Sequence, residues 1–304
     1  MNTSRRIFLK NSTLALAGTA AFTSKIFAAD LGKDLLGIQL YSVRDDMSKD
    51  AVGTLKQIAA MGYKNVEHAN YVDRKFYGQS ATEFKKTLDD LGLNMPSGHT
   101  VMGKQHWDDT KKDFTDAWKF TVEDAATLGQ QFVISPWLDE GMRSNVDDFK
   151  RYMDVFNKSG ELCKKSGMKF GYHNHDFEFN TQLDGKRLYD LILQNTDPNL
   201  VIQQMDIGNM YGAGGRPLDL IKQYPGRFAS MHVKDEIKTG NAGEMGGYES
   251  TVLGAGVMQV KKVIAAARKS GGTIDFIVEQ ESYQDKTPLA SAKEDYDMMK
   301  KWGY

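Results

Sequence analysis

The alternation of short apolar runs with longer helical patterns is the feature that most constrains the fold of this 304-residue chain. From Leu35 onward, eight runs with the character of buried strands each precede a stretch whose apolar residues recur at helical spacing. Such an alternation is typical of repeated βα units, which build a parallel sheet covered by helices. The predicted strands are residues 36–41, 65–67, 93–99, 131–135, 169–179, 201–206, 228–232 and 275–280. The predicted helices lie near residues 49–61, 81–91, 107–128, 146–166, 188–194, 218–223 and 257–269, and in a final stretch that ends at Trp302.

Eight βα units in about 270 residues favour a closed (β/α)8 barrel, an α/β fold in which a single domain uses the whole stretch. A doubly wound sheet with a dinucleotide site is the alternative, but no G-x-G-x-x-G motif follows the first predicted strand. We therefore predict one barrel domain over residues 30–304. In such barrels the active site lies at the C-terminal ends of the strands.

Good metal ligands stand near the ends of the last four predicted strands. His173 and His175 are two residues apart in the fifth strand, so both side chains should point to the same face. Asp206, His232 and Glu279 end the next three strands. We predict that one cavity receives these side chains and holds a divalent metal, or a metal beside a proton-transfer group. The alternative is a polar strand end whose histidines only form hydrogen bonds.

The order of these residues on strands five to eight resembles the xylose-isomerase-like barrel superfamily of sugar isomerases and epimerases, inosose dehydratase and endonuclease IV. The resemblance covers the chain from about Leu35 to Tyr304. It rests on the motifs Met205-Asp206-Ile207-Gly208-Asn209, Met231-His232-Val233-Lys234-Asp235 and Val278-Glu279-Gln280. It implies one divalent metal held by ligands from strands five to eight. The superfamily's isomerases carry a glutamate on strand five, where this chain has His173-Asn174-His175. We take His173 as the ligand, and this departure gives weight to the inosose dehydratase branch.

Two imidazoles and two carboxylates suit one Mn, Co, Zn or Mg ion with open positions for sugar oxygens. A keto sugar bound through its carbonyl and the neighbouring hydroxyl would have its α-proton acidified, because the metal stabilises the enediolate. Glu279 is then both a ligand and the candidate base, and His175 or Glu178 would act on the other face. Lys234 would stabilise the developing oxyanion, unless it is a solvated surface lysine.

Four further residues at strand ends are candidate substrate contacts. Glu67 and His99 end strands two and three, and either could instead be the hydrogen-bond partner of a metal ligand. Trp137 and Tyr41 are placed to stack on a sugar ring, although aromatic residues at strand ends also serve as rim packing.

We predict a metal-dependent sugar isomerase or epimerase that abstracts a proton next to a carbonyl. The first alternative is a lyase or dehydratase on a keto sugar or keto-glycoside, and the second is a non-catalytic sugar-binding barrel. The formal net charge of −1 gives no bulk attraction for nucleic acid, so a small-molecule sugar is the expected partner and a nuclease is not supported. The sequence leaves a homo-oligomer open.

The N-terminus predicts export. Ser4-Arg5-Arg6-Ile7-Phe8-Leu9-Lys10 resembles the twin-arginine signal motif and precedes a mildly apolar run over residues 12–22. We expect residues 1–29 to be a signal peptide, the mature protein to be periplasmic, and no stable membrane insertion after cleavage. A Gly-rich insertion at residues 238–256 is expected to close over the site as a mobile lid.

Overall fold

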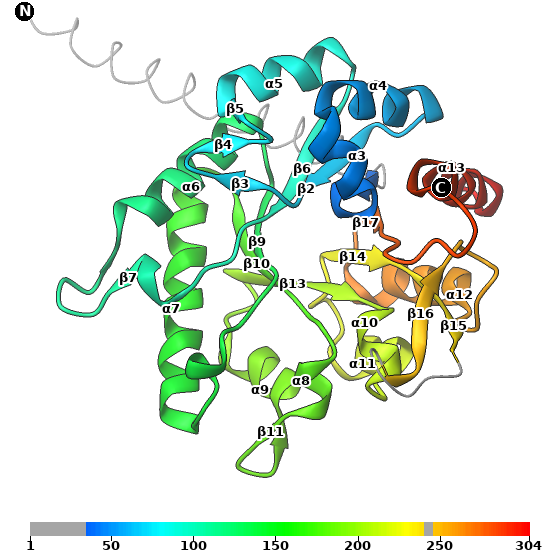
Figure 1. Ribbon diagram of the computed structural model, residues 1–304. Coiled ribbons are helices and arrows are strands. Elements are labelled where there is room, and N and C mark those ends of the chain that lie inside the picture. The colour runs from blue at the N-terminus through cyan, green and yellow to red at the C-terminus, as the bar shows by residue number, and fades with distance from the viewer. Residues whose placement is uncertain (1–34, 240–245) are drawn as a thin grey trace, which may run out of the picture. The chain divides into compact units, whose positions relative to one another are not determined.

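The computed structural model describes residues 35–239 and 246–304, which form a closed barrel of eight parallel strands with helices around it (Figure 1). Neighbouring strands pair in chain order, and the first strand closes the barrel against the last. The prediction of a single (β/α)8 barrel is therefore confirmed. The barrel strands are β1 (Leu35–Gln39), β2 (Asn65–His68), β6 (Asn94–His99), β9 (Phe132–Ser135), β10 (Lys169–His173), β13 (Val201–Asp206), β14 (Ser230–Val233) and β17 (Asp275–Val278).

Helices follow the strands and bury one face against the outside of the barrel. The longer ones are α4 (Ala51–Met61), α5 (Ala81–Asp90), α6 (Asp116–Leu128), α7 (Val146–Lys165), α9 (Leu188–Asn195), α11 (Pro217–Gln223), α12 (Val260–Ala266) with the π-helical turn η5 (Ala267–Gly271), and α13 (Pro288–Trp302). Short helices connect them at η1 (Leu40–Val43), α3 (Arg44–Lys49), η2 (Lys104–His106), η3 (Glu140–Met142), α8 (Phe177–Asn180) and α10 (Asn209–Gly212).

Local sequence signals fix where several helices begin and end. Ser80 and Glu83 form a reciprocal capping box at the start of α5, with Glu83 Oε2 accepting from the backbone N–H of Ser80 at 2.9 Å. Gly62 ends α4 in the left-handed region at φ 112°, a conformation that glycine adopts without steric cost. The chain can therefore turn sharply from α4 into β2, whose end carries Glu67.

The inward-facing side chains of the barrel change from apolar to polar along the strands. Ile202, Gln204 and Asp206 share one face of β13, because alternate strand residues point the same way. Ile202 packs with Phe132 and Ile134 in an apolar cluster inside the barrel, whereas Gln204 and Asp206 belong to a polar layer nearer the strand ends. The barrel therefore presents its polar groups at the end where active sites of this fold lie.

The helix predicted at residues 107–128 is wrong in its first part. Residues 107–115 form a short hairpin, β7 (Trp107–Asp108) and β8 (Asp113–Phe114), and α6 begins only at Asp116. The reason is local: Asp108 Oδ1 accepts hydrogen bonds from the backbone N–H groups of Thr110 and Lys111 at 2.9 and 3.0 Å. Such side-chain-to-backbone bonds compete with helix formation.

The fifth strand is shorter than predicted. It ends at His173, and the chain then turns into the short helix α8 rather than continuing to residue 179. Glu178 Oε2 accepts a hydrogen bond from the backbone N–H of His175 at 2.8 Å, which stabilises the turn. His175 is therefore a turn residue and not a strand residue.

The insertion after strand seven is partly regular. Its flanks form the antiparallel pair β15 (Asp235–Lys238) and β16 (Tyr248–Thr251). Asp235 Oδ2 accepts from the backbone N–H groups of Gly254 and Gly256, so the return of the chain to the barrel is anchored. Residues 240–245, the centre of the predicted lid, lie outside the described residues.

Two other small sheets lie outside the barrel strands. One contains β3 (Tyr71–Val72), β4 (Lys75–Phe76) and β5 (Gln79–Ser80), and the other contains β11 (Gln182–Leu183) and β12 (Lys186–Arg187). The predicted signal peptide, residues 1–29, and the predicted domain start at residue 30 fall outside the described ranges. Within those ranges, no helix combines the length and apolar character needed to cross a bilayer.

Candidate active site

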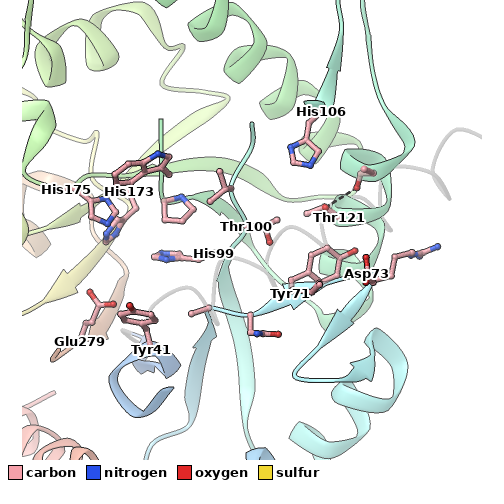
Figure 2. Close-up of a pocket in the computed structure, with 18 of the residues that line it drawn as sticks. Tyr41, Tyr71, Asp73, His99, Thr100, His106, Thr121, His173, His175 and Glu279 are labelled. Atoms are coloured by element: carbon pink, nitrogen blue, oxygen red, sulfur yellow. Dashed lines mark hydrogen bonds between the residues drawn. The ribbon is translucent and has the colours of Figure 1, made fainter. Parts of the chain in front are cut away.

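The C-terminal ends of five barrel strands bring three imidazoles and two carboxylates together. They are His99 from β6, His173 from β10, Asp206 from β13, His232 from β14 and Glu279 directly after β17. The ring centroids of His173 and His232 lie 4.5 Å apart, and those of His99 and His232 lie 5.1 Å apart. Figure 2 shows His99, His173, His175 and Glu279 around the same space.

Asp206, His232 and Glu279 can offer ligand atoms that lie within 4.8 Å of one another. His232 Nδ1 lies 2.9 Å from Glu279 Oε2 and 3.6 Å from Asp206 Oδ2. His173 Nε2 approaches the same Asp206 oxygen at 3.8 Å. Asp206 Oδ1 accepts from the backbone N–H of Asn209, but its buried Oδ2 accepts no hydrogen bond from the described part of the chain. The Lys234 ammonium lies 3.2 Å from Oδ2, and the position of this oxygen among imidazole and carboxylate groups fits a metal ligand.

The two histidines that would bind a metal are each held through their other ring nitrogen. His232 Nε2 lies 2.6 Å from Glu67 Oε1, and His173 Nδ1 lies 3.0 Å from Gln204 Oε1. In His173 the acceptor places the proton on Nδ1 and leaves the lone pair of Nε2 for a metal. In His232 both ring nitrogens face carboxylates, and although burial opposes the charge, Glu279 and Glu67 raise the pKa of His232 well above its ordinary value, so a metal bound at Nδ1 would displace a proton. The donor set of His173, Asp206, His232 and Glu279 therefore fits a divalent ion such as zinc or manganese.

A second group of three histidines, His99, His173 and His232, is also compact enough to surround an ion. In this group, however, the Nε2 atoms of His99 and His232 already face Glu67 Oε1 at 3.2 and 2.6 Å. Free ligand atoms thus favour the group that contains Asp206 and Glu279.

Glu67 contacts the candidate metal ligand His232 and does not line the cavity. The carboxylate is fully buried and accepts hydrogen bonds from the side-chain amides of Gln39 and Gln204 at 2.7 and 2.8 Å. Burial alone would raise the pKa of Glu67, but His99 and His232 lower that pKa to about 2. This placement favours the second of its two predicted roles, the orientation of a ligand histidine, over contact with substrate.

Lys234 is buried among carboxylates and is not a surface lysine. Its ammonium lies 2.8 Å from Glu279 Oε2 and 3.2 Å from Asp206 Oδ2, and it also pairs with Glu281. Burial opposes the charge, but Asp206 and Glu279 raise the pKa of Lys234 well above its ordinary value. Lys234 therefore remains a fixed positive charge beside the candidate ligands.

His175 faces the same cavity as His173, although it comes from a turn. The two ring centroids lie 5.0 Å apart, and Trp137 packs edge-on against His175 at 5.4 Å. His175 Nδ1 is buried and has no hydrogen-bond partner among the described residues. Burial lowers the pKa of His175 to about 4, so its imidazole is neutral at pH 7.

Glu178 lies behind His175 and does not line the cavity. Its carboxyl group is fully buried, and it accepts hydrogen bonds from Tyr172 Oη and from the backbone N–H of His175. Burial raises the pKa of Glu178 to about 7. The predicted role of Glu178 as a base on substrate therefore has no geometric support, because the group positions the turn that carries His175.

The candidate site opens into a cavity of about 1030 Å³. Tyr41, in the short helix η1 after β1, and Trp137, after β9, are both exposed on its wall, as expected of aromatic residues that contact a ligand. His99 also lines this cavity.

Sequence reasoning missed several residues of the site. Gln204 binds both His173 and Glu67, while Asn209 and Glu281 hold the ammonium of Lys234 and line the cavity. Gln204 stands two residues before Asp206 on β13, so the period of two in an extended strand was a usable signal for it. Glu281 lies after the end of β17, where this period does not apply. Asn209 was not detectable in this way, since a turn brings it back to Asp206.

A parallel (β/α)8 barrel with a buried histidine and carboxylate group at its C-terminal strand ends is an enzyme scaffold with a candidate metal centre. The chain belongs to the xylose isomerase-like TIM barrel family, whose model matches residues 55–302. The resemblance expected from the strand-end motifs is confirmed at the level of this family, which includes sugar isomerases or epimerases and dehydratases.

Individual relatives are named either as dehydratases or as isomerases/epimerases. The inosose dehydratase of Clostridium botulinum (strain Alaska E43 / Type E3) is 24% identical over 192 residues, which cover 60% of this chain. The chain spans 62% of the length of that relative. A sugar phosphate isomerase/epimerase from Parabacteroides distasonis ATCC 8503 superposes with a TM-score of 0.73 at 25% identity, covering 88% of this chain and 94% of that one.

The IOLI protein, whose crystal structure is described with a zinc atom, superposes with a TM-score of 0.66 and covers 87% of this chain and 97% of its own. At 13% identity this likeness shows the shared fold alone.

Proposed function

We propose that the protein is a metal-dependent lyase or dehydratase that acts on a keto sugar. In this reaction the proton on the carbon next to the carbonyl is removed, and a leaving group departs from the following carbon. The inosose dehydratase relatives support this reaction class over isomerisation.

The observation that carries the proposal is the residue on the fifth strand. A glutamate there could bind a metal through one oxygen and still accept a proton from substrate through the other. His173 cannot do both, because its Nε2 faces the ligand group and its Nδ1 is bound to Gln204 Oε1. An epimerase that works with one base on each face of the sugar lacks its second carboxylate here, whereas an elimination needs only one base for carbon.

The remaining roles follow from position. A bound divalent ion would polarise the carbonyl and its neighbouring hydroxyl as a Lewis acid. Glu279 lines the cavity and is the candidate base for the α-proton. The Lys234 ammonium, 2.8 Å from Glu279 Oε2, keeps this carboxylate ionised and adds positive charge where negative charge develops. His175 lines the cavity with a neutral imidazole whose buried Nδ1 has no partner among the described residues, and it is the candidate to relay a proton to the leaving oxygen.

The test is a solvent-exchange assay with keto sugars that carry a hydroxyl or alkoxy group β to the carbonyl. The protein is loaded with Zn²⁺ or Mn²⁺ in separate samples and incubated with substrate in D₂O. We expect ultraviolet absorption of a conjugated enone together with release of the leaving group. Glu279→Gln, which keeps the shape of the side chain, should abolish both signals.

Isomerase or epimerase activity is the second candidate, favoured by the 25%-identical Parabacteroides structure and by the position of His175 across from Glu279 in the cavity. Its signature in the same assay is an isomeric product that contains deuterium and retains every substituent. That outcome would replace the lyase proposal. If the protein binds sugar but no metal supports deuterium exchange, the non-catalytic sugar-binding barrel would be the remaining hypothesis.

A further inference from the structure

We infer that the cavity contains an outer subsite for an aromatic group attached to the sugar, so that the substrate is a keto-glycoside with an aromatic aglycone. This inference rests on the proposed function, since it assigns the leaving group of that reaction. The outer subsite is the part of the cavity formed by Tyr71, Val72, Val101, Phe120 and Thr121.

The size of the cavity first points to a substrate larger than one sugar ring. Its volume of about 1030 Å³ lies at the upper end of the range of about 300–1,000 Å³ for pockets that hold drug-sized ligands. The candidate metal ligands occupy one end only. In Figure 2, Glu279 and His173 lie at the left, Tyr71, Thr121 and His106 lie at the right, and His99 stands between them.

Exposed apolar side chains are concentrated in this cavity. Seven large hydrophobic residues are exposed among those that the structure describes, and five of them line it: Tyr41, Val72, Val101, Phe120 and Trp137. Scattered exposed hydrophobic residues need no explanation, but a group of them around one concave surface marks a binding site.

The two polar side chains of the outer subsite, Tyr71 and Thr121, and the neighbouring Arg74 are bound to protein partners. Tyr71 Oη donates to Asp124 Oδ2 at 2.6 Å, and the guanidinium of Arg74 pairs with both oxygens of Asp124. Thr121 Oγ1 donates to a backbone carbonyl of its own helix at 3.1 Å, as Figure 2 shows. Because the hydroxyl groups of Tyr71 and Thr121 already donate to protein acceptors, an apolar ring fits the surface that these residues form better than a second sugar. Neighbouring parts of the cavity are lined by Asn70, Asp73 and Thr100.

The same pairing argues against a phosphorylated substrate. Arg74 is the one arginine or lysine among the described residues that line the cavity, and Asp124 and Glu123 already neutralise it. A phosphate would have to compete with two carboxylates for this guanidinium.

Side-chain contacts connect the elements that form the wall of the outer subsite. Tyr71, on β3, packs against Phe76, on β4, with ring centroids 4.7 Å apart. The Arg74 guanidinium covers the ring of Phe120, on α6, at 4.1 Å from its centroid. The small sheet β3–β4–β5 and α6 are thus linked through side-chain contacts, which would reduce the entropy lost on binding.

The chemistry of the proposed reaction is consistent with this substrate. The α C–H bond breaks and its proton passes to the base, a C=C bond forms between the α and β carbons, and the C–O bond to the aglycone breaks with its electron pair on oxygen. The departing oxygen takes up one proton, so that the products are an unsaturated keto sugar and a phenol or alcohol.

Binding of unreactive glycosides tests the subsite without turnover. With the metal-loaded protein, calorimetry should show that 4-nitrophenyl β-glucoside binds about 3- to 10-fold more tightly than methyl β-glucoside, the gain expected of one added aromatic contact. Phe120→Ala and Val72→Ser should each remove most of this preference and leave the affinity for methyl β-glucoside unchanged. Val257→Ala is the matched control, because Val257 is an exposed hydrophobic residue outside this cavity.

The outcomes separate the two proposals. Equal affinity for the two glycosides, or tighter binding of a disaccharide such as cellobiose than of the aryl glucoside, would overturn the subsite even if keto sugars are turned over. An aryl preference that depends on Phe120 and Val72 supports the subsite even if the lyase assay fails.

Discussion

His173 and His175 are two residues apart, and the structure gives them different surroundings. His173 ends β10 with Nδ1 bound to Gln204 Oε1 and Nε2 3.8 Å from Asp206 Oδ2, whereas His175 has a buried nitrogen without a partner among the described residues. Hydrogen bonding to Gln204 fixes the tautomer of His173 and suits it to bind metal. The free nitrogen of His175 suits it to transfer protons.

We predict that His175→Ala keeps its metal and loses about 10²- to 10⁴-fold in turnover, the usual contribution of a proton-transfer group. His106→Ala is the control, because His106 lines the same cavity but lies outside the candidate metal group. Loss of metal from His175→Ala would exchange the roles of His173 and His175.

We predict that Asp206→Ala, His232→Ala and Glu279→Ala are each folded, poor in metal and inactive. Loss of a ligand should weaken metal binding by more than the about 10- to 100-fold lost with a hydrogen-bond partner of a ligand. The fold should survive, because the side chains lie at the strand ends. Elemental analysis of the purified variants is the measurement. Stoichiometric metal in Asp206→Ala or His232→Ala would refute the site.

The candidate ligands could be predicted because the end of a parallel strand has a sequence signature, an apolar run that stops at a polar residue. Residues that reach the site from turns carry no such signature. Asn209 returns to Asp206 only through the turn that starts α10, and the outer wall near Tyr71 depends on a small sheet of two-residue strands. Both depend on tertiary packing that the local sequence does not record.

At the scale of elements, the eight strands were predicted from their apolar runs, and the errors occurred where side chains bond to the backbone. Asp108 diverts residues 107–115 into a hairpin, and Glu178 ends the extended stretch at His173. In both places the composition suits a helix or a strand, but a carboxylate that satisfies nearby N–H groups stabilises a turn instead.

A pH-dependent stability is predicted for the contact between α13 and the segment after β16. Asp295 accepts a hydrogen bond from the backbone N–H of Leu253 at 2.8 Å, and burial raises its pKa to about 7 from an ordinary value of 3.8. A carboxyl group whose folded pKa is raised takes up a proton on folding. Its contribution therefore becomes less favourable as the pH rises from about 4 to about 7, and then levels off.

Asp295→Asn keeps an acceptor oxygen for Leu253 and removes this titration. The Tm of Asp295→Asn minus the Tm of the unchanged protein should increase as the pH rises from about 5 to about 7.5. Both Tm values are measured by circular dichroism in the presence of a chelator. Asp297→Asn, on the exposed side of the same helix, is the control. Parallel Tm curves for the unchanged protein and Asp295→Asn would contradict the prediction.

At the scale of the whole molecule, we propose that the chain is exported by the twin-arginine route, which carries folded proteins. Replacement of both Arg5 and Arg6 by Lys should retain the protein in the cytoplasm, as measured by cell fractionation and immunoblotting. A Lys10→Arg variant, which leaves the arginine pair intact, is the control. Unchanged periplasmic recovery of the double variant would exclude this route.

The buried ammonium of Lys234 also affects the expected stability of the fold with and without a bound metal. Because Lys234 pairs with Asp206, Glu279 and Glu281, these carboxylates keep an internal counter-ion when a chelator strips the site. Metal removal should therefore cost little beyond the loss of ligand binding, so that chelated protein stays folded and recovers activity on readdition of metal. Lys234→Met would leave the acidic groups to repel one another. In the presence of a chelator, the Tm of this variant should therefore be well below the Tm of the unchanged protein. We therefore expect the fold to form without the metal, so that an ion could be bound after folding in whichever compartment supplies it.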